Sequence, residues 1–527
     1  MKKALLLSIL FLSSFSVLAQ DIAITATQSE IFKDKRKHTE LLFSDNDDNG
    51  GFVTVRASVN GFSGRPKEYI IEYYGSDLKL VQEKVIDVDG NIINGMKVQG
   101  GKVYLMEVAL VKDEEIYSFN ILEAALNDFN FKKKTLFTLN EDEIKKYFGF
   151  VLGVIFVNNG LDQEDTDRFG EITFSKNGNF FCVNFDLKGK EEQKQRLYVF
   201  NKNFEKVFEK DFKRDIKDRL FDFENLDVDD NTGEVYLLGK VYENDSRRKK
   251  SKGKANYHFE LYKISKDNQQ SISFKTEENF IGSLFTLRSD DRISCAGFYS
   301  EKNDYRYKGV ARFDIDPNTM QVIKKSFQPF SDQFMKDKYG KVKDKELHNL
   351  KFRSGFLSPQ GDVIINAEEY FAVYHTSMGM NGMMNSYTSY HYNDIISVKI
   401  NKEGELVWAR NINKNQGTTR NNKGDYLSFS STVVNNDTYI FINCSDKIKK
   451  LRNDRLLFKG ASIKKSNLYV IKIDQEGNYS YKNIVGHKDS DVAFYVRQGI
   501  SASPEGDEMV FIGRKNSKKQ FLKLSIL

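Results

Sequence analysis

The sequence predicts an all-β fold built from about eight repeated units, and three observations lead to this prediction. The chain of 527 residues contains 42 Phe and 26 Tyr but only 5 Pro and 1 Trp, a usage that suits pleated, half-buried strands. Short runs of alternating apolar and polar residues recur along the chain, as strands buried on one face require. Gly, Asn and Asp, which accept positive φ angles, separate these runs where hairpin turns are expected.

The repeats share one apolar strand pattern that returns along the chain. A typical copy runs from Ile395 to Ile400, and the polar turn 401–404 and a further strand follow it. The copies span residues 69–74, 116–121, 196–200, 258–264, 309–315, 395–400, 468–473 and 520–527. A hairpin precedes each copy, and its turn falls at Gly51, Gly101, Gly178, Gly233, Asp291, Gly361, Asn436 or Gly506.

Four strands per unit, repeated in this way, describe a β-propeller of eight four-stranded blades, with seven blades as the alternative. The last unit has no fourth strand after its final copy, which ends at Leu527. An open edge strand invites aggregation, so another segment must cover it. Residues 21–27 alternate apolar and polar side chains. We expect this N-terminal segment to supply the missing outer strand and close the ring.

One copy carries a more specific pattern. In residues 394–408, Asp394 opens an apolar strand that ends near Lys399, and a glycine turn leads to a strand with Trp408. This stretch resembles the repeat of bacterial exported β-propeller proteins, and the other copies resemble it more loosely. The resemblance implies the fold and says little about activity.

The first 19 residues have the order of a secretory signal peptide. Lys2 and Lys3 precede an apolar stretch, and Ala19 offers a small residue before a cleavage site. We therefore expect residues 1–19 to be removed and residues 20–527 to form a single propeller domain. No cysteine follows the cut, and the longest later apolar run, residues 147–157, is too short to cross a membrane. The expected location is the periplasm or cell surface of a Gram-negative bacterium.

Charge and cysteine content exclude two classes of protein. The 80 basic and 74 acidic side chains leave a net charge of only +6, which argues against a dedicated nucleic-acid binder. The three cysteines, Cys182, Cys295 and Cys444, are an odd number spread over the chain. No disulfide framework is implied, and we expect three buried thiols.

Long insertions fall on one face of the expected ring. In a four-stranded blade, the loops joining strands one to two and three to four lie on one face, and the other loops lie on the opposite face. The insertions span residues 140–171, 243–256, 328–350, 374–393 and 445–466, all on this second face. Asn140 with Glu143, and Ser331 ahead of Gly340, indicate helices in two of them. Binding residues concentrate on such loops.

Two of these insertions contain candidate partner-binding residues. The first is rich in methionine and tyrosine, and its thioethers would suit Cu(I), a partner surface, or a loop that only packs over its blade. The second is basic and would suit an anionic glycan, lipid headgroups or an acidic partner, unless it is simply solvated. We predict partner binding by Tyr374, His375, Met378, Met380, Met383, Met384, Tyr387, Tyr390, His391, Arg247, Arg248, Lys249 and Lys250.

No metal site or cofactor is predicted. Residues 45–50 match the opening half of a calcium loop, but Val53 and Arg56 stand where the closing ligands should be, so a polar hairpin turn is expected. The six histidines occupy dissimilar places in their repeats, and no catalytic motif contains them.

The preferred hypothesis is a noncatalytic binding or scaffold protein that recognises a protein or glycan through the insertion-rich face. The alternative is a propeller hydrolase or lyase acting on an extracellular polymer. Clustered carboxylates and histidines at the mouth of the ring would favour the enzyme. An apolar and basic mouth would favour the binder.

Overall fold

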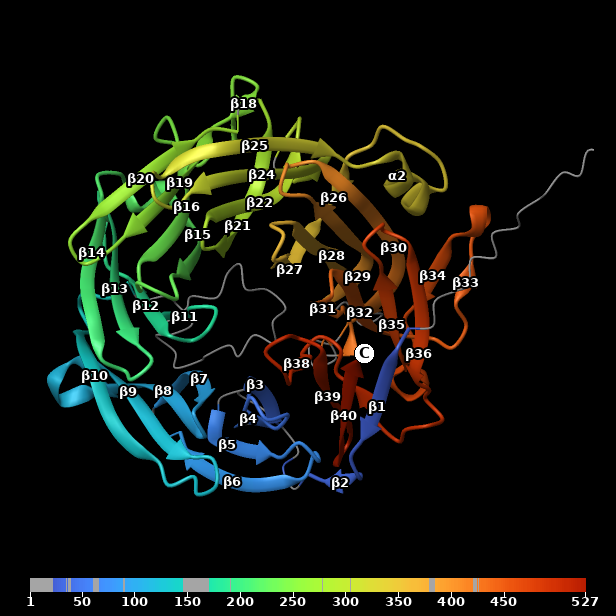
Figure 1. Ribbon diagram of the computed structural model, residues 1–527, viewed down its shortest axis with the longest axis horizontal. Coiled ribbons are helices and arrows are strands. Elements are labelled where there is room, and N and C mark those ends of the chain that lie inside the picture. Colours follow the sequence, from blue (N-terminus) through green and yellow to red (C-terminus); the bar gives the residue numbers. More distant parts are fainter. Residues whose placement is uncertain are drawn as a thin grey trace, which may run out of the picture.

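The strands of the computed structural model form sheets that stand next to one another around a central axis (Figure 1). The structure describes residues 22–527 except 35, 37–38, 60–65, 89–90, 146–169, 190, 277, 304, 379–383, 420–423 and 425. The predicted signal peptide and its cleavage site lie outside the described residues.

Within that part of the chain, the strands form six four-stranded sheets, two six-stranded sheets and two two-stranded ribbons. In chain order, and from the inner to the outer strand, the first sheet contains β3 (Thr39–Asn46), β4 (Phe52–Val59), β5 (Pro66–Tyr74) and β6 (Leu80–Asp87), and the second contains β7 (Ile92–Gln99), β8 (Lys102–Val111), β9 (Ile116–Ala125) and β10 (Lys132–Asn140). The third sheet contains β11 (Glu171–Phe174), β12 (Phe180–Asp186), β13 (Gln193–Asn201) and β14 (Lys206–Arg214). The fourth sheet contains β15 (Phe221–Val228), β16 (Val235–Tyr242), β19 (Tyr257–Ile264) and β20 (Gln269–Phe274).

The remaining sheets repeat the same order, with additions. One sheet contains β21 (Phe280–Ser289), β22 (Arg292–Ser300), β24 (Gly309–Asp316) and β25 (Gln321–Pro329), and the next contains β27 (Leu350–Leu357), β28 (Val363–Met378), β29 (Met384–Ile400) and β30 (Leu406–Thr418), extended by β34 (Leu456–Lys459) and β33 (Lys449–Lys450). The following sheet contains β31 (Ser430–Val434), β32 (Asp437–Cys444), β35 (Asn467–Ile473) and β36 (Tyr479–Val485). The last sheet contains β37 (Ala493–Phe494) and β38 (Ile500–Ser501) with β39 (Glu508–Lys515), β40 (Lys518–Ile526), β1 (Ile24–Gln28) and β2 (Phe32–Lys33).

Short elements occupy the connections. The ribbons pair β17 (Lys250–Ser251) with β18 (Lys254–Ala255), and β23 (Arg306–Tyr307) with β26 (Leu347–His348). Single 3₁₀ turns cover Lys112–Glu114, Asp218–Leu220, Arg452–Asp454 and Ile463–Lys465, and one helix, α2, covers Asp332–Tyr339. No helix in the described part of the chain is long and apolar enough to cross a membrane.

Buried apolar side chains lie between neighbouring sheets, so each sheet packs face to face against the next. One core cluster joins the β4 and β8 sheets through Val55 and Leu105, and a further cluster follows at each step around the ring. The circle closes where Phe52 and Tyr74 of the first sheet pack on Phe521 of the last sheet. A closed circle of sheets packed in this way is a β-propeller.

The outer strand of the last sheet comes from the N-terminal end of the described chain. β1 pairs antiparallel with β40, from Ile24 opposite Ile526 to Gln28 opposite Leu522. This is the pairing expected from the alternation in residues 21–27. Ile22, just before β1, is buried in the core between the last two sheets.

A salt bridge recurs at one register of the second and third strands. It explains why the repeated strand ends near a lysine such as Lys399, which lies 3.2 Å from Asp362. In each pair, one residue lies at or just before the start of the second strand and the other lies on the third strand. The first of these residues is two positions before the residue that is directly opposite the third-strand residue. Four sheets have the acid first, in Glu234–Lys263, Asp362–Lys399, Asp437–Lys472 and Glu508–Lys523, and two have it second, in Lys102–Glu123 and Arg292–Asp314.

The two expected helices have different outcomes. α2 is confirmed: the Ser331 hydroxyl accepts a hydrogen bond from the backbone N–H of Phe334, and Gly340 ends the helix at a φ of 75°. The helix expected from Asn140 does not start there, because Asn140 is the last residue of β10 and a turn follows at 141–143. Residues 146–169 of that insertion lie outside the described part of the chain.

Deleting residues 22–28 should destabilise the whole protein, because β40 loses its outer neighbour and the core loses Ile22. Burial of one such side chain contributes about 1.5–3 kcal/mol. Chemical denaturation should show a lower free energy of unfolding for the truncated protein. The control, Thr25→Ser with Thr27→Ser, changes two exposed side chains of β1 and should leave the value unchanged. Equal stability of the truncated and intact proteins would contradict closure by β1.

Exchanging the two residues of the Asp362–Lys399 pair should be tolerated better than removing either one, because two other sheets carry the pair in reverse. Both side chains are largely buried, so each single variant leaves an uncompensated charge. We expect a coupling of about 0.5–3 kcal/mol in a double-mutant cycle of Asp362→Lys and Lys399→Asp measured by denaturation. Additive effects of the two substitutions would show that the recurring pair is incidental.

The three cysteines should react with a thiol reagent only after unfolding. Cys182, Cys295 and Cys444 are free and buried in different sheets, as expected. Burial raises the pKa of Cys295 and Cys444 to about 12, and it also raises the pKa of Cys182, so the reactive thiolate is rare. Mass spectrometry of native and denatured protein after labelling measures this difference. Labelling of the native protein, or a disulfide within it, would refute the prediction.

Candidate binding site

The methionine- and tyrosine-rich segment forms a long hairpin that extends the two central strands of the β28 sheet. β28 runs to Met378 and β29 begins at Met384, and these two residues pair, as do Val373 and Ser389. The expected loop insertion at 374–393 is therefore a continuation of the sheet, because the cross-strand pairing persists beyond the neighbouring strands. We call residues 370–378 and 384–392 the arm.

The outer half of the arm presents large apolar side chains to solvent. Tyr374, Met378, Met384 and Tyr387 are between 50% and 79% exposed. Tyr390, nearer the base, is partly buried. The other two predicted methionines, Met380 and Met383, lie outside the described residues. The arm thus presents an adaptable apolar surface to solvent, and partner binding by it stays a prediction.

Both predicted histidines of the arm meet at one serine. The Ser389 hydroxyl lies 2.7 Å from Nε2 of His375 and 3.0 Å from Nε2 of His391. The His375 ring stacks on Tyr387, and the His391 ring stacks on Phe371. Cross-strand stacking and a shared hydroxyl fix the position of the two imidazoles on the arm.

The basic run contacts both its own sheet and the next one. Arg247 forms a salt bridge of 2.6 Å with Asp222, and the Lys250 ammonium donates a hydrogen bond to the backbone carbonyl of Lys302. Arg248 is exposed, and Lys249 also has a partner. The run belongs to the β16–β19 connection, and the β21–β25 sheet stands between it and the arm (Figure 1). The structure does not bring the two predicted groups together.

In residues 45–50, the Asp47 carboxylate forms hydrogen bonds within its own sheet. Oδ1 of Asp47 accepts hydrogen bonds of 2.8 Å from the backbone N–H groups of Asn49 and Gly51, and Oδ2 accepts one from the Tyr73 hydroxyl. The carboxylate is therefore used to shape the turn. Elsewhere, the described residues contain no group of three or more His, Cys, Asp or Glu side chains placed to hold a metal ion.

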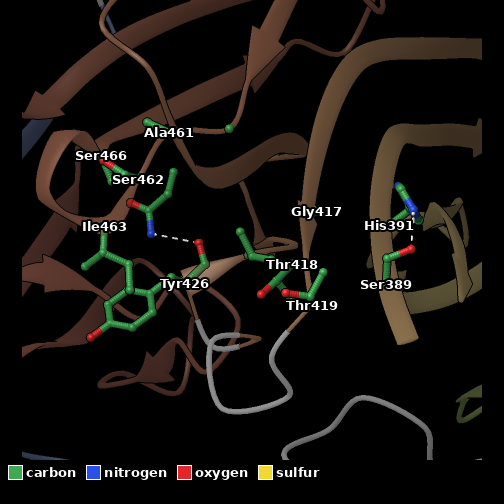
Figure 2. Close-up of a pocket in the computed structure, with 13 residues that line it drawn as sticks. Ser389, His391, Gly417, Thr418, Thr419, Tyr426, Ala461, Ser462, Ile463 and Ser466 are labelled. Atoms are coloured by element: carbon green, nitrogen blue, oxygen red, sulfur yellow. Dashed lines mark hydrogen bonds between the residues drawn. The ribbon is translucent and has the colours of Figure 1, made fainter. Parts of the chain in front are cut away.

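A pocket of about 600 Å³ lies between the base of the arm and the β32–β35 insertion. Figure 2 shows Ser389 and His391 on one side and Tyr426, Ser462 and Ile463 on the other, with Thr418 and Thr419 between them. Asn443 holds part of the wall, because its side-chain amide donates to the Tyr426 carbonyl. No Asp, Glu, Lys or Arg side chain is among the described residues that line it. We call it the hydroxyl pocket.

A second pocket, of about 300 Å³, lies at the mouth of the ring. Its lining includes Lys351 and Arg353 of β27, Ser430 and Ser431 of β31, and Arg497 just before β38. Figure 1 places β27, β31 and β38 near the centre of the ring, and these residues stand at the start of their strands, on the insertion-rich side. No carboxylate or histidine is among the described lining residues. We call it the basic pocket.

A buried carboxylate fixes the basic pocket from behind. Glu368 is fully buried, and its oxygens lie 2.6 Å from Arg353 Nη2, 2.6 Å from Lys414 Nζ and 2.7 Å from the Ser428 hydroxyl. Burial alone would raise the pKa of Glu368, but the charges of Lys414 and Arg353 outweigh it and lower the pKa. Glu368 is therefore an anion that is shared by two cations, and the pocket keeps a net positive charge.

Of the residues that line the two pockets, only His391 was predicted as a binding residue. Lys351 and Arg353 alternate around Phe352 at the start of an innermost strand, and this spacing places both side chains on one face of the strand. Two cations on one face of an inner strand are a sequence signal for an anion-binding surface. Arg497, Tyr426 and Ser462 come from irregular segments, and their position depends on the packing of sheets far apart in sequence.

Comparisons with known proteins give a fold likeness only. No model of a protein family matches the chain, and no curated protein matches it. Among solved structures, it is similar to the β-propeller domain of the trilobed protease from Pyrococcus furiosus, at 10% identity and a TM-score of 0.34 over 69% of this chain and 91% of that chain. It is also similar to Pyrococcus horikoshii acylaminoacyl peptidase, at 12% identity and a TM-score of 0.33 over 82% of this chain.

The chain spans 58% of that acylaminoacyl peptidase, so the peptidase has a large part with no counterpart here. An oligogalacturonate lyase in complex with manganese is similar over 96% of this chain and 98% of its own, at 7% identity and a TM-score of 0.34. These low scores carry no inference about activity. The β-propeller architecture of this chain therefore depends on its own closed circle of packed sheets.

Proposed function

We propose that this protein is a noncatalytic binding protein of the periplasm or cell surface of a Gram-negative bacterium. Its single domain, over residues 20–527, would be an eight-bladed propeller that recognises a glycan or protein through the insertion-rich face. The observation that carries the proposal is the composition of the basic pocket: Lys351, Arg353 and Arg497 line it, and the Glu368 carboxylate behind it is held in salt bridges.

The arm is the second support for a binding function. Its exposed tyrosines and methionines form an apolar surface beside the hydroxyl pocket, and Ser389 and His391 belong to both. A few polar groups around a concave site beside apolar side chains are typical of ligand recognition. We include in the binding surface the predicted residues of the arm. The basic run at Arg247 to Lys250 stays a separate prediction, because its distance from the pockets requires a different contact.

The alternative, a hydrolase or lyase acting on an extracellular polymer, is favoured by one observation. Ser389 is within hydrogen-bond reach of two imidazoles, as a serine activated by a base must be. A triad also needs a third group that orients the base. Within the described residues, neither His375 nor His391 forms a hydrogen bond with a carboxylate. The geometry therefore supports recognition better than nucleophilic catalysis.

Trimming the arm should abolish ligand capture and leave folding nearly intact, since a surface hairpin contributes little to the core. Residues 375–387 would be replaced by an Asn-Gly turn, which keeps the pairing of Tyr374 with Thr388. The measurement is retention of glycans and exported proteins by the immobilised protein, with the mass of each ligand determined before and after.

Two controls decide between the functions. Shortening the 175–179 turn on the opposite face should lower stability without a separate loss of capture. Ser389→Ala should leave captured ligands chemically unchanged, as they should be with the intact protein. Conversion of a ligand to a product by the intact protein, lost in Ser389→Ala, would establish the enzyme instead. Full ligand capture by the trimmed protein would show that the arm is not part of the binding surface.

A further inference from the structure

The hydroxyl pocket and the basic pocket lie on two sides of one short segment. Tyr426 and Leu427 line the first pocket, and the next two residues, Ser428 and Phe429, line the second. The backbone N–H of Ser428 donates to Gln416, whose amide donates to the Asn443 carbonyl, so the segment is fixed between the pockets. A ligand longer than one ring could occupy both.

The hydroxyl pocket favours an uncharged, hydroxyl-rich group. The side-chain hydroxyls of Thr419, Ser462 and Ser466 line it and form no hydrogen bond within the part of the chain that the structure describes. Each hydroxyl can both donate and accept, which is the capacity that the hydroxyls of a sugar ring need in a partner. A volume of about 600 Å³ is in the range of pockets that hold a ligand of several rings.

The basic pocket favours an anion. Nε and Nη2 of Arg353 both donate to Glu368, which leaves Nη1 outside these bonds, and Lys351 and Arg497 add two further cations. The Ser430 hydroxyl, also in the lining, is buried and has no hydrogen-bond partner among the described residues. Such donors are the usual partners of a carboxylate or sulfate.

We propose that the two pockets together bind an acidic oligosaccharide, with neutral sugar hydroxyls in the hydroxyl pocket and a carboxylate or sulfate in the basic pocket. The inference rests on the proposed binding function and names its ligand class. An acidic peptide would satisfy the basic pocket but would leave the hydroxyls of the other pocket without matching groups. A free inorganic anion would occupy the basic pocket alone.

The test measures binding of uronate- and sulfate-bearing oligosaccharides of two to six sugars by titration calorimetry. Each is compared with its carboxyl-reduced or desulfated form, with a hexa-aspartate peptide and with sodium sulfate. We expect at least one acidic oligosaccharide to bind about tenfold more tightly than its neutral form and than either control anion.

Variants assign the binding to the two pockets. Arg497→Gln and Lys351→Gln should each weaken binding of the acidic oligosaccharide about tenfold, while Lys202→Gln, on the opposite face, removes the same charge and should have no effect. The double variant Ser462→Ala with Thr419→Val should weaken binding of the oligosaccharide but not binding of sulfate. Circular dichroism and the melting temperature identify a variant that fails to fold.

The outcomes separate this inference from the function on which it rests. Three results would overturn the inference that the ligand is an acidic oligosaccharide. They are equal affinity for the acidic and neutral oligosaccharides, equal affinity for the acidic oligosaccharide and hexa-aspartate, and unchanged affinity in both Arg497→Gln and Lys351→Gln. If no oligosaccharide binds while the intact arm still captures an exported protein, the inference fails and the binding function stands. If neither assay detects a ligand, the proposed function fails as well.

Discussion

Closure of the ring between its first and last sheets is the constraint on which the rest of the structure depends. Each sheet is apolar on both faces, so it can bury them only if it has a neighbour on either side. The last contact in the circle is made by Phe521, whose ring lies 5.2 Å from Phe52 and 4.4 Å from Tyr74. Without this contact, two sheets would each expose one apolar face and the circle would open.

Buried charges reinforce the same contact. Glu72 of the first sheet accepts hydrogen bonds from Arg56 and lies 3.3 Å from Lys519 of the last sheet, while Arg56 also lies 2.6 Å from Asp34. Burial would raise the pKa of Glu72, but Lys519 and Arg56 lower it to about 2. Removing one partner from a buried pair costs about 3–5 kcal/mol. The N-terminal segment that contains Asp34 is thus fixed to the closing contact by charge as well as by pairing.

Turns on the face with short turns accept hydrogen bonds from neighbouring sheets. Fully buried Arg312 donates hydrogen bonds to the carbonyls of Gly361 and Asn401, both in turns of the next sheet. Arg288 forms a salt bridge with Asp229 in a turn of the sheet before its own. A longer turn at such a place would displace an acceptor and leave a buried cation without a partner. This cost is a physical reason for the shortness of the turns on this face.

The sequence was sufficient for the repeat, the strand order and the strand that closes the ring, because each is encoded in local alternation and turn residues. It was insufficient for the arm, since residues 374–393 read as an interruption although the pairing of Val373 with Ser389 continues the sheet. The basic pocket could not be predicted as a unit. Lys351 and Arg497 belong to different sheets, with the β31–β36 sheet between them along the chain, and they line one pocket only because inner strands converge on one axis.

That convergence also explains how a small pocket can keep several cations close together. Arg353 and Lys414 would repel each other if Glu368 did not lie between them at 2.6 Å from each. Burial of Glu368 would cost free energy without both cations, because an unpaired buried carboxylate loses its hydration without compensation. The three side chains therefore hold one another in place on rigid strands, before any ligand arrives. A ligand anion would meet donors that are already oriented and would not have to order them, and such preorganisation is what raises the affinity of a polar site.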